Sequence, residues 1–300
     1  MLYLQQWTDK RSRLIEFSRQ GPDRAAKPRL TSPKGTGYVR GLNSIPGLPP
    51  HEAQNLEEVF FKIADDAAAR ALRILLTPPP WNMTVDEKSG WSRFLMSVIS
   101  RHPESVEKHR VVAEALFKQA FPEIEADYAA RRAPTDPPTY MEYAALHSPN
   151  PAGRIRAILM QRIIDSELTR RGLNSLRWMA LHEPNPKHLF LTSDRPVVMT
   201  NGLDKPNSQL LIPISPRHVF VATNNIQTEN YIRKVRHDRQ LIQQVNERVA
   251  LQSRKYVWAL SDAQLSFVTK RLGRAWTADP LENLTTERLL EFARTQKARK

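Results

Sequence analysis

Apolar residues recur at helical spacing through the first half of the chain. Over residues 53–76 they return every three or four positions, as on one face of an amphipathic helix, and Pro78–Pro80 ends that pattern. Ser89 is placed to cap a second helix, Pro103 separates it from a third, and Pro122 marks a further boundary. The first half is therefore predicted to be mainly helical.

The pattern changes to short apolar runs bounded by turn residues in the second half. One more helix is expected over residues 153–171, with Gly172 as its C-cap, and a short helix over 173–181 leads into the strands. The predicted strands are 189–191, 196–199, 209–213, 218–223 and 255–259. Helices are expected over 238–253, 262–272 and 285–296.

The N-terminal part shows no strong helical period. Residues 2–7 and 13–18 are predicted to form a hairpin, and 21–50 to be an irregular loop rich in proline and basic residues. The fold class is therefore α+β, with a helical N-terminal half packed on a small, mainly antiparallel late sheet.

Four stretches organise the chain, and we expect them to form one compact unit. The expected stretches are an N-terminal hairpin and loop (1–50), a helical region (51–181), a sheet region (182–284) and a C-terminal helix with a basic tail (285–300).

Composition narrows the class of protein. Cysteine is absent, which excludes disulfides and cysteine metal sites. No apolar run reaches the length needed to span a bilayer, and the N-terminus lacks a basic region followed by an apolar core. We therefore expect a cytoplasmic protein without a membrane partner.

A net charge of +14 indicates attraction to nucleic acid or another polyanion. The alternative is a basic background spread over every helix, because the cations are dispersed. The modest clusters are Arg131-Arg132, Arg170-Arg171 and the segment 297–300. Charge alone does not choose between these interpretations.

The polar corner Thr192-Ser193-Asp194-Arg195-Pro196, between two apolar runs, contains the leading candidate residue. The Asp194 carboxylate, next to the Ser193 hydroxyl, could bind a metal or act as a base. The alternative is that Asp194 bonds backbone amides of the turn and Pro196 stiffens it.

Two residues of the helical half are candidate partners of Asp194. Glu57 begins the first helix and could be a second metal ligand, or it could complement the helix dipole. Arg101 could clamp a carboxylate or phosphate, or form a salt bridge with Asp194.

Several standard signatures are missing. The chain has neither a glycine-rich phosphate loop nor a Gly-x-Ser-x-Gly elbow, and its histidines show no metal-ligand spacing. Trp91, Trp178 and Trp258 lie in apolar patterns and are predicted to be core residues rather than base-stacking platforms.

Five patches in one order resemble a bacterial family, domain of unknown function 4238. They are residues 2–7, Asn55-Leu56-Glu57, Ser100-Arg101-His102-Pro103, residues 190–198 and Ile212–Pro216. The resemblance spans nearly all the chain, and Thr192–Pro196 is its most specific part. The family's opening histidine and proline are absent here, and Arg195 replaces the usual asparagine. The resemblance locates the family's motifs on this chain, but it does not imply a reaction.

These observations leave three hypotheses. The first is a metal-assisted hydrolase or nuclease acting on an anionic substrate, with Asp194, Ser193, Glu57 and Arg101 in its site and a divalent metal held by Asp194 and Glu57. The second is a non-catalytic module that binds nucleic acid or another anionic partner. The third is a structural interaction protein in which the motif joins helices to sheet.

Overall fold

The structure is a computed structural model, and it describes residues 2–19, 25–37, 62–147, 150–185, 187, 189–200 and 205–274. The chain divides into two compact units. The first comprises Met1–Tyr38, Asp65–Ile99 and Glu167–Pro280, and the second comprises Val39–Ala64, Ser100–Ser166 and Leu281–Lys300. Each unit is described by itself below.

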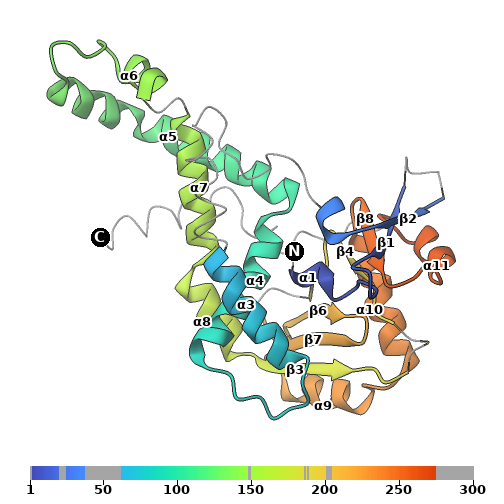
Figure 1. The fold of residues 1–300 in the computed structure, drawn as a ribbon. Coiled ribbons are helices and arrows are strands. Elements are labelled where there is room, and N and C mark those ends of the chain that lie inside the picture. Colours follow the sequence, from blue (N-terminus) through green and yellow to red (C-terminus); the bar gives the residue numbers. More distant parts are fainter. Residues whose placement is uncertain are drawn as a thin grey trace. The chain divides into compact units, whose positions relative to one another are not determined.

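Helices dominate the N-terminal half and antiparallel strands the C-terminal half, so the predicted α+β class is confirmed (Figure 1). The helices are α1 (Leu2–Gln5), α3 (Lys62–Leu75), α4 (Val85–Ser100), α5 (Pro103–Arg131), α6 (Tyr140–His147), α7 (Pro151–Ile164), α8 (Glu167–Ser175), α9 (Ile226–Lys234), α10 (Arg239–Gln252) and α11 (Leu265–Thr269). The strands are β1 (Leu14–Ser18), β2 (Lys27–Thr31), β3 (Arg177–His182), β4 (Thr192–Ser193), β5 (Val198–Thr200), β6 (Gln209–Ser215), β7 (His218–Thr223) and β8 (Tyr256–Ala259). A short 3-10 helix spans Pro33–Gly35.

The first unit contains two four-stranded sheets. Sheet A has the order β2-β1-β8-β4, and sheet B has the order β3-β7-β6-β5, with every pairing antiparallel. In sheet A, β8 lies between β1 and β4, so segments from opposite ends of the chain share one ladder. In sheet B, β5, β6 and β7 form a meander, and β3, which precedes them in sequence, pairs with the other side of β7.

Helix α10 packs against both sheets. Its Val245 and Val249 join the apolar cluster that includes Val219 and Val221 of sheet B, while Ala250 joins a second cluster with Val257 of sheet A. The helical period places these α10 residues on adjacent faces, so one amphipathic helix fills the space between two sheets.

The opposite face of sheet B is aromatic. Trp91 of α4 meets Phe220 edge-on, with ring centroids 5.5 Å apart, and Trp178 of β3 meets the same ring at 5.1 Å. Trp91 and Trp258 are buried as predicted, and Trp178 is half-buried. Alternation along β7 explains the arrangement, because Phe220 points to the face opposite Val219 and Val221.

The second unit includes α5, α6 and α7. Tyr128 of α5 packs against Tyr140 and Tyr143 of α6, and its hydroxyl donates to the Pro137 carbonyl at 2.7 Å. This cluster ties the α5–α6 connection to the helix that precedes it. Among the described helices, none is both long and apolar enough to cross a membrane.

The N-terminal hairpin prediction is wrong in its pairing. Residues 2–5 form a helix, and β1 pairs with β2 inside the stretch predicted to be an irregular loop. The apolar residues of 2–7 follow a helical turn, which places Tyr3 and Trp7 on one side, with their rings 5.1 Å apart.

Two helix boundaries in the N-terminal half also differ from the prediction. Helix α4 begins before Ser89, at a capping box in which the Thr84 hydroxyl accepts from the Glu87 amide and the Glu87 carboxylate accepts from the Thr84 amide. Helix α5 continues through Pro122. Pro122 is exposed, so water can satisfy the carbonyl that loses its helical partner.

The predicted helix 153–171 is two helices. The break lies at Asp165-Ser166, and Gly172 lies inside α8 rather than at a C-cap. The predicted helix 173–181 is wrong, because the alternation of Met179 and Leu181 forms β3 instead.

The late elements agree better with the prediction. β6, β7, β8 and α10 lie where expected, and Asp238 caps α10 by accepting from the Gln240 amide at 2.8 Å. Helix α9 was not predicted, and 189–191 is not a strand. The predicted helix 285–296 and the beginning of the helix 53–76 lie outside the described residues.

Replacing Trp91 with alanine should lower the free energy of unfolding by about 3–5 kcal/mol, because the residue is 1% exposed and the lost ring leaves a cavity against Phe220. Urea unfolding followed by circular dichroism measures the change. Leu168→Ala on α8 is the matched control, since that side chain is 80% exposed and should change stability by less than about 0.5 kcal/mol. Equal effects of the two substitutions would contradict the packing described here.

Candidate functional site

The Asp194 carboxylate accepts three backbone hydrogen bonds from the segment that leads into β8. Its Oδ1 accepts from the Arg254 amide at 2.9 Å, and its Oδ2 accepts from Lys255 at 2.7 Å and Tyr256 at 3.1 Å. The Asp194 amide in turn donates to the Tyr256 carbonyl at 3.1 Å. Burial raises the pKa of Asp194, and the three amide donors oppose that shift. The carboxylate thus caps a neighbouring chain segment.

Side chains of α10 satisfy the backbone on both sides of this corner. Asn246 accepts from the Leu191 amide at 2.8 Å and donates to the Leu189 carbonyl at 2.9 Å. Gln252 donates to the carbonyls of Arg195 and Val197, the latter at 3.0 Å. Buried backbone groups of an irregular segment need hydrogen-bond partners. Side chains of α10 supply the partners that a neighbouring strand would supply in a sheet.

The N-terminal helix completes the corner. The Tyr3 hydroxyl lies 2.7 Å from the Thr192 hydroxyl and donates to the Pro213 carbonyl at 2.6 Å. The Trp7 indole donates to the Phe190 carbonyl at 3.0 Å, and its ring is fully buried. Three of the five sequence patches quoted for the family resemblance therefore meet at one place.

The four predicted site residues are only partly located. Ser193 lies beside Asp194, and its hydroxyl accepts from the Arg195 amide at 3.1 Å. Arg101 is half-buried in the second unit, and Glu57 lies outside the described residues. The convergence of all four side chains stays a prediction. Within the ranges that the structure describes, no group of three or more histidine or carboxylate residues could hold a metal ion.

Asp194→Ala should reduce the free energy of unfolding by about 1–3 kcal/mol, because three amides lose a charged acceptor. Chemical denaturation measures it. Asp262→Ala, at an exposed position, should change stability by less than about 0.5 kcal/mol. A destabilisation no larger than that of the control would show that the three hydrogen bonds do not hold this corner.

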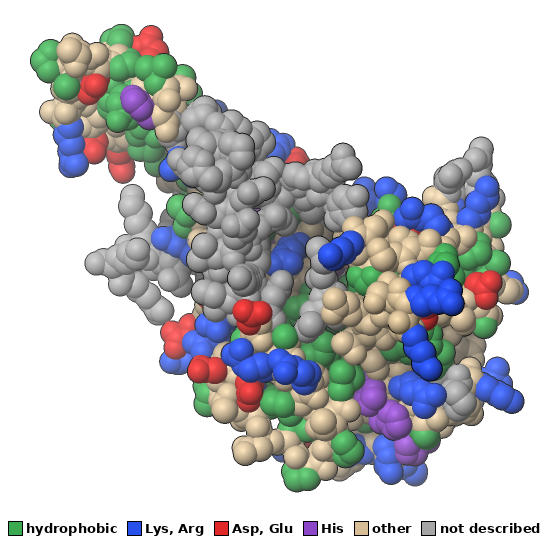
Figure 2. All heavy atoms as spheres, in the orientation of Figure 1, with side chains coloured by type: hydrophobic (Ala, Val, Ile, Leu, Met, Phe, Trp, Pro, Cys, Tyr) green, Lys and Arg blue, Asp and Glu red, His purple; other side chains and the backbone are tan. Residues whose placement is uncertain are grey.

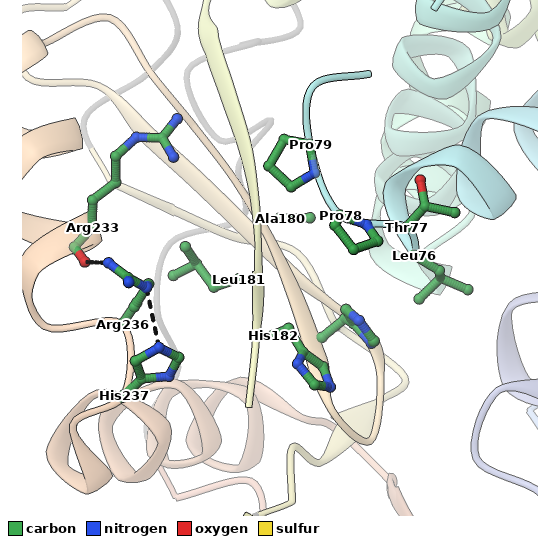
Figure 3. A pocket seen from close by; sticks show the side chains of 11 residues that line it. Leu76, Thr77, Pro78, Pro79, Ala180, Leu181, His182, Arg233, Arg236 and His237 are labelled. Carbon is green, nitrogen blue, oxygen red and sulfur yellow. Dashed lines mark hydrogen bonds between the residues drawn. The ribbon is translucent and has the colours of Figure 1, made fainter. Parts of the chain in front are cut away.

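A groove of about 570 Å³ lies along the outer edge of sheet B. Ala180–His182 of β3 form its floor, and His218 of β7 lies next to them. One wall is residues 76–79, which follow α3, and the other is Arg233 with Arg236-His237 at the end of α9. Figure 3 shows β3 running between these two walls.

The lining of this edge groove is apolar and basic. Three of its residues are histidines and two are arginines, and none is acidic. Arg236 donates to the His237 ring at 3.1 Å and to the Arg233 carbonyl at 2.8 Å, and it has no ion pair within the described residues. Figure 2 shows histidine side chains gathered next to lysine and arginine side chains on one face. A groove with this lining favours anionic groups.

Strand pairing brings two of the histidines together. His182 and His218 are register partners of β3 and β7, and their ring centroids lie 4.6 Å apart. The Ser215 hydroxyl lies 2.8 Å from His218 Nδ1 and accepts from the Arg217 amide at 3.1 Å. The Ser215 hydroxyl can donate to Nδ1 or accept from it, and the tautomer of a neutral His218 decides which.

Burial lowers the pKa of His218 to about 4, and the nearby charges of His182 and Arg217 act in the same direction. The imidazole is thus neutral at neutral pH.

Sequence spacing could not reveal this groove, since His182, His218 and His237 are far apart along the chain. The one usable signal was the position of His182 and His218 at the ends of two apolar runs, which a hairpin-type register brings opposite each other. The helix predicted over 173–181 overlaps β3, so the sequence prediction does not include the pairing of His182 with His218.

The folded protein should lose stability as the pH falls from 6.5 to 4, in part through His218. Its pKa is about 4 when folded and 6.5 in an ordinary setting, so the unfolded chain takes up this proton first. The loss should be smaller in His218→Gln. Denaturant titrations across this pH range test it, and an NMR titration of the folded protein should place the His218 midpoint near 4. A midpoint near 6.5 would contradict the described burial.

Comparison with known proteins gives one match. Residues 1–263 match a family model whose description is Protein of unknown function (DUF4238). No curated protein and no solved structure matches the chain.

Proposed function

Because the chain belongs to the DUF4238 family, whose description names no reaction, we propose a function from the edge groove: the protein binds a partner through that partner's carboxylate or phosphate groups. The observation that carries the proposal is the lining, which combines three histidines and two arginines with no acidic residue. It develops the binding hypothesis that the basic composition suggested.

The electrostatics of the groove support the proposal. Arg236 is exposed and has no ion pair within the described part of the chain, so its guanidinium can approach an anion without first leaving such a partner. Arg233 is already paired with Glu229 at 2.8 Å and contributes a weaker net field. The neutral His218 adds no charge to the groove.

The metal-assisted hydrolase hypothesis has weaker support. Both carboxylate oxygens of Asp194 are occupied by backbone amides, which is the arrangement of a structural cap. The contacts of the corner favour the interpretation in which Asp194 holds chain segments together, and we place the binding function elsewhere, at the edge of sheet B.

The test is titration of the protein with pyrophosphate, followed by NMR of the imidazole resonances and by calorimetry. Arg236→Gln should weaken binding about tenfold, since it removes one charge-assisted contact. Added salt should weaken binding in the wild-type protein more than in the variant.

The matched control is Arg131→Gln. Arg131 is also an exposed arginine, but it lies on α5 and pairs with Asp127 at 2.8 Å. It should leave pyrophosphate binding unchanged. Equal loss in the two variants would point to net charge rather than to the groove, and an unchanged affinity in Arg236→Gln would overturn the proposed function.

A further inference from the structure

Strand β3 is an edge strand, and its hydrogen-bonding direction follows from the register. The Glu183 amide donates to the Arg217 carbonyl at 2.8 Å, which makes residues 183 and 217 a hydrogen-bonded pair. In an antiparallel ladder such pairs alternate with non-bonded ones. Counting back along the register, Leu181 bonds to β7, whereas Ala180 and His182 turn their backbone N–H and C=O groups outward.

The pairing of β7 with β6 leads to the same assignment of inward and outward backbone groups. The Asn224 amide donates to the Ser208 carbonyl, so the even-numbered residues of β7 bond to β6 and the odd-numbered residues bond to β3. The outward groups of Ala180 and His182 have no hydrogen-bond partner among the described residues. Both residues line the floor of the edge groove.

We propose that the edge groove takes an extended acidic segment of another protein, which adds to β3 as a further strand of sheet B. The proposal rests on the proposed function and names its partner. Unpaired donors and acceptors at strand spacing, lying in a groove with walls on both sides, match the backbone of a peptide in β-augmentation.

The two walls specify the side chains of the segment. Side chains of an added strand would point alternately to the two faces of sheet B. On one face they would meet Arg236 and His237, and on the other Pro78 and Pro79 (Figure 3). The complementary sequence alternates acidic with apolar residues. Nucleic acid offers no such alternation of acidic and apolar groups, and the sugar-phosphate backbone of DNA has no donor for the outward carbonyls.

The experiment uses an acetylated peptide of alternating valine and glutamate and the full chain, with affinity measured by fluorescence anisotropy. Ala180→Pro removes an outward N–H without removing a ladder bond, because proline is compatible with an edge position. It should weaken peptide binding about tenfold. Ala180→Val also enlarges the side chain but keeps the N–H, so it should bind the peptide more tightly than Ala180→Pro. Circular dichroism checks that both variants are folded.

A second measurement leaves the protein unchanged. Alternate amides of an extended peptide point to opposite edges, so methylating one set should abolish binding and methylating the other should preserve it. Equal binding of the two methylated peptides would overturn the strand-addition proposal.

The two proposals can fail separately. If Ala180→Pro binds the peptide normally while Arg236→Gln weakens both peptide and pyrophosphate, strand addition is wrong and the anion site stands. If Arg236→Gln changes neither, the proposed function is wrong. An oligonucleotide that binds equally well to wild type and Ala180→Pro, with no peptide binding, would identify a nucleic-acid site and would also overturn strand addition.

Discussion

Two kinds of hydrogen bond hold the first unit together: amide side chains satisfy the backbone of residues 189–197, and the Asp194 carboxylate within that segment accepts from the amides of residues 254–256. This segment passes from sheet A to sheet B with almost no regular structure, and its buried polar groups would be costly without partners. Asn246 and Gln252 of α10 supply those partners on one side. The Asp194 carboxylate in turn accepts hydrogen bonds from the Arg254 and Lys255 amides, just before β8. Each sheet is therefore fixed to the same helix by directional bonds as well as by apolar packing.

This arrangement explains why the most specific family motif need not be a reaction centre. Thr192 meets Tyr3, Ser193 closes its own turn, and Asp194 binds neighbouring amides, so each hydroxyl or carboxylate already has a backbone or side-chain partner. Polar residues whose hydrogen bonds are all internal specify a structure by making alternatives unfavourable. A motif of such structural residues can therefore identify a family no less specifically than a catalytic motif.

The sequence predicts an element well where residues close together in the chain determine it, and poorly where pairing with a distant segment decides. The apolar runs of β6 and β7 and the helical period of α10 are local, and the strands predicted over 209–213 and 218–223 and the helix predicted over 238–253 are confirmed. Tyr3 and Trp7 were assigned to a strand because the propensity of bulky residues is ambiguous over one turn. The helix predicted over 173–181 is wrong, since only pairing with β7 decides the structure of the short apolar run in β3. Asp194 stands out in the sequence as a candidate site residue, but its hydrogen-bond partners are backbone amides, which carry no mark in a sequence.

The ladder of sheet A has a consequence for biosynthesis. Strand β1 is made within the first 18 residues, yet its partner β8 is Tyr256–Ala259. The emerging chain must therefore carry Leu14 and Phe17, both fully buried in the end, unprotected while more than two hundred further residues are translated. Residues 100–166 of the second unit are synthesised before β8, whereas residues 281–300 of that unit follow it. Sheet A can therefore be completed only after β8 has been synthesised.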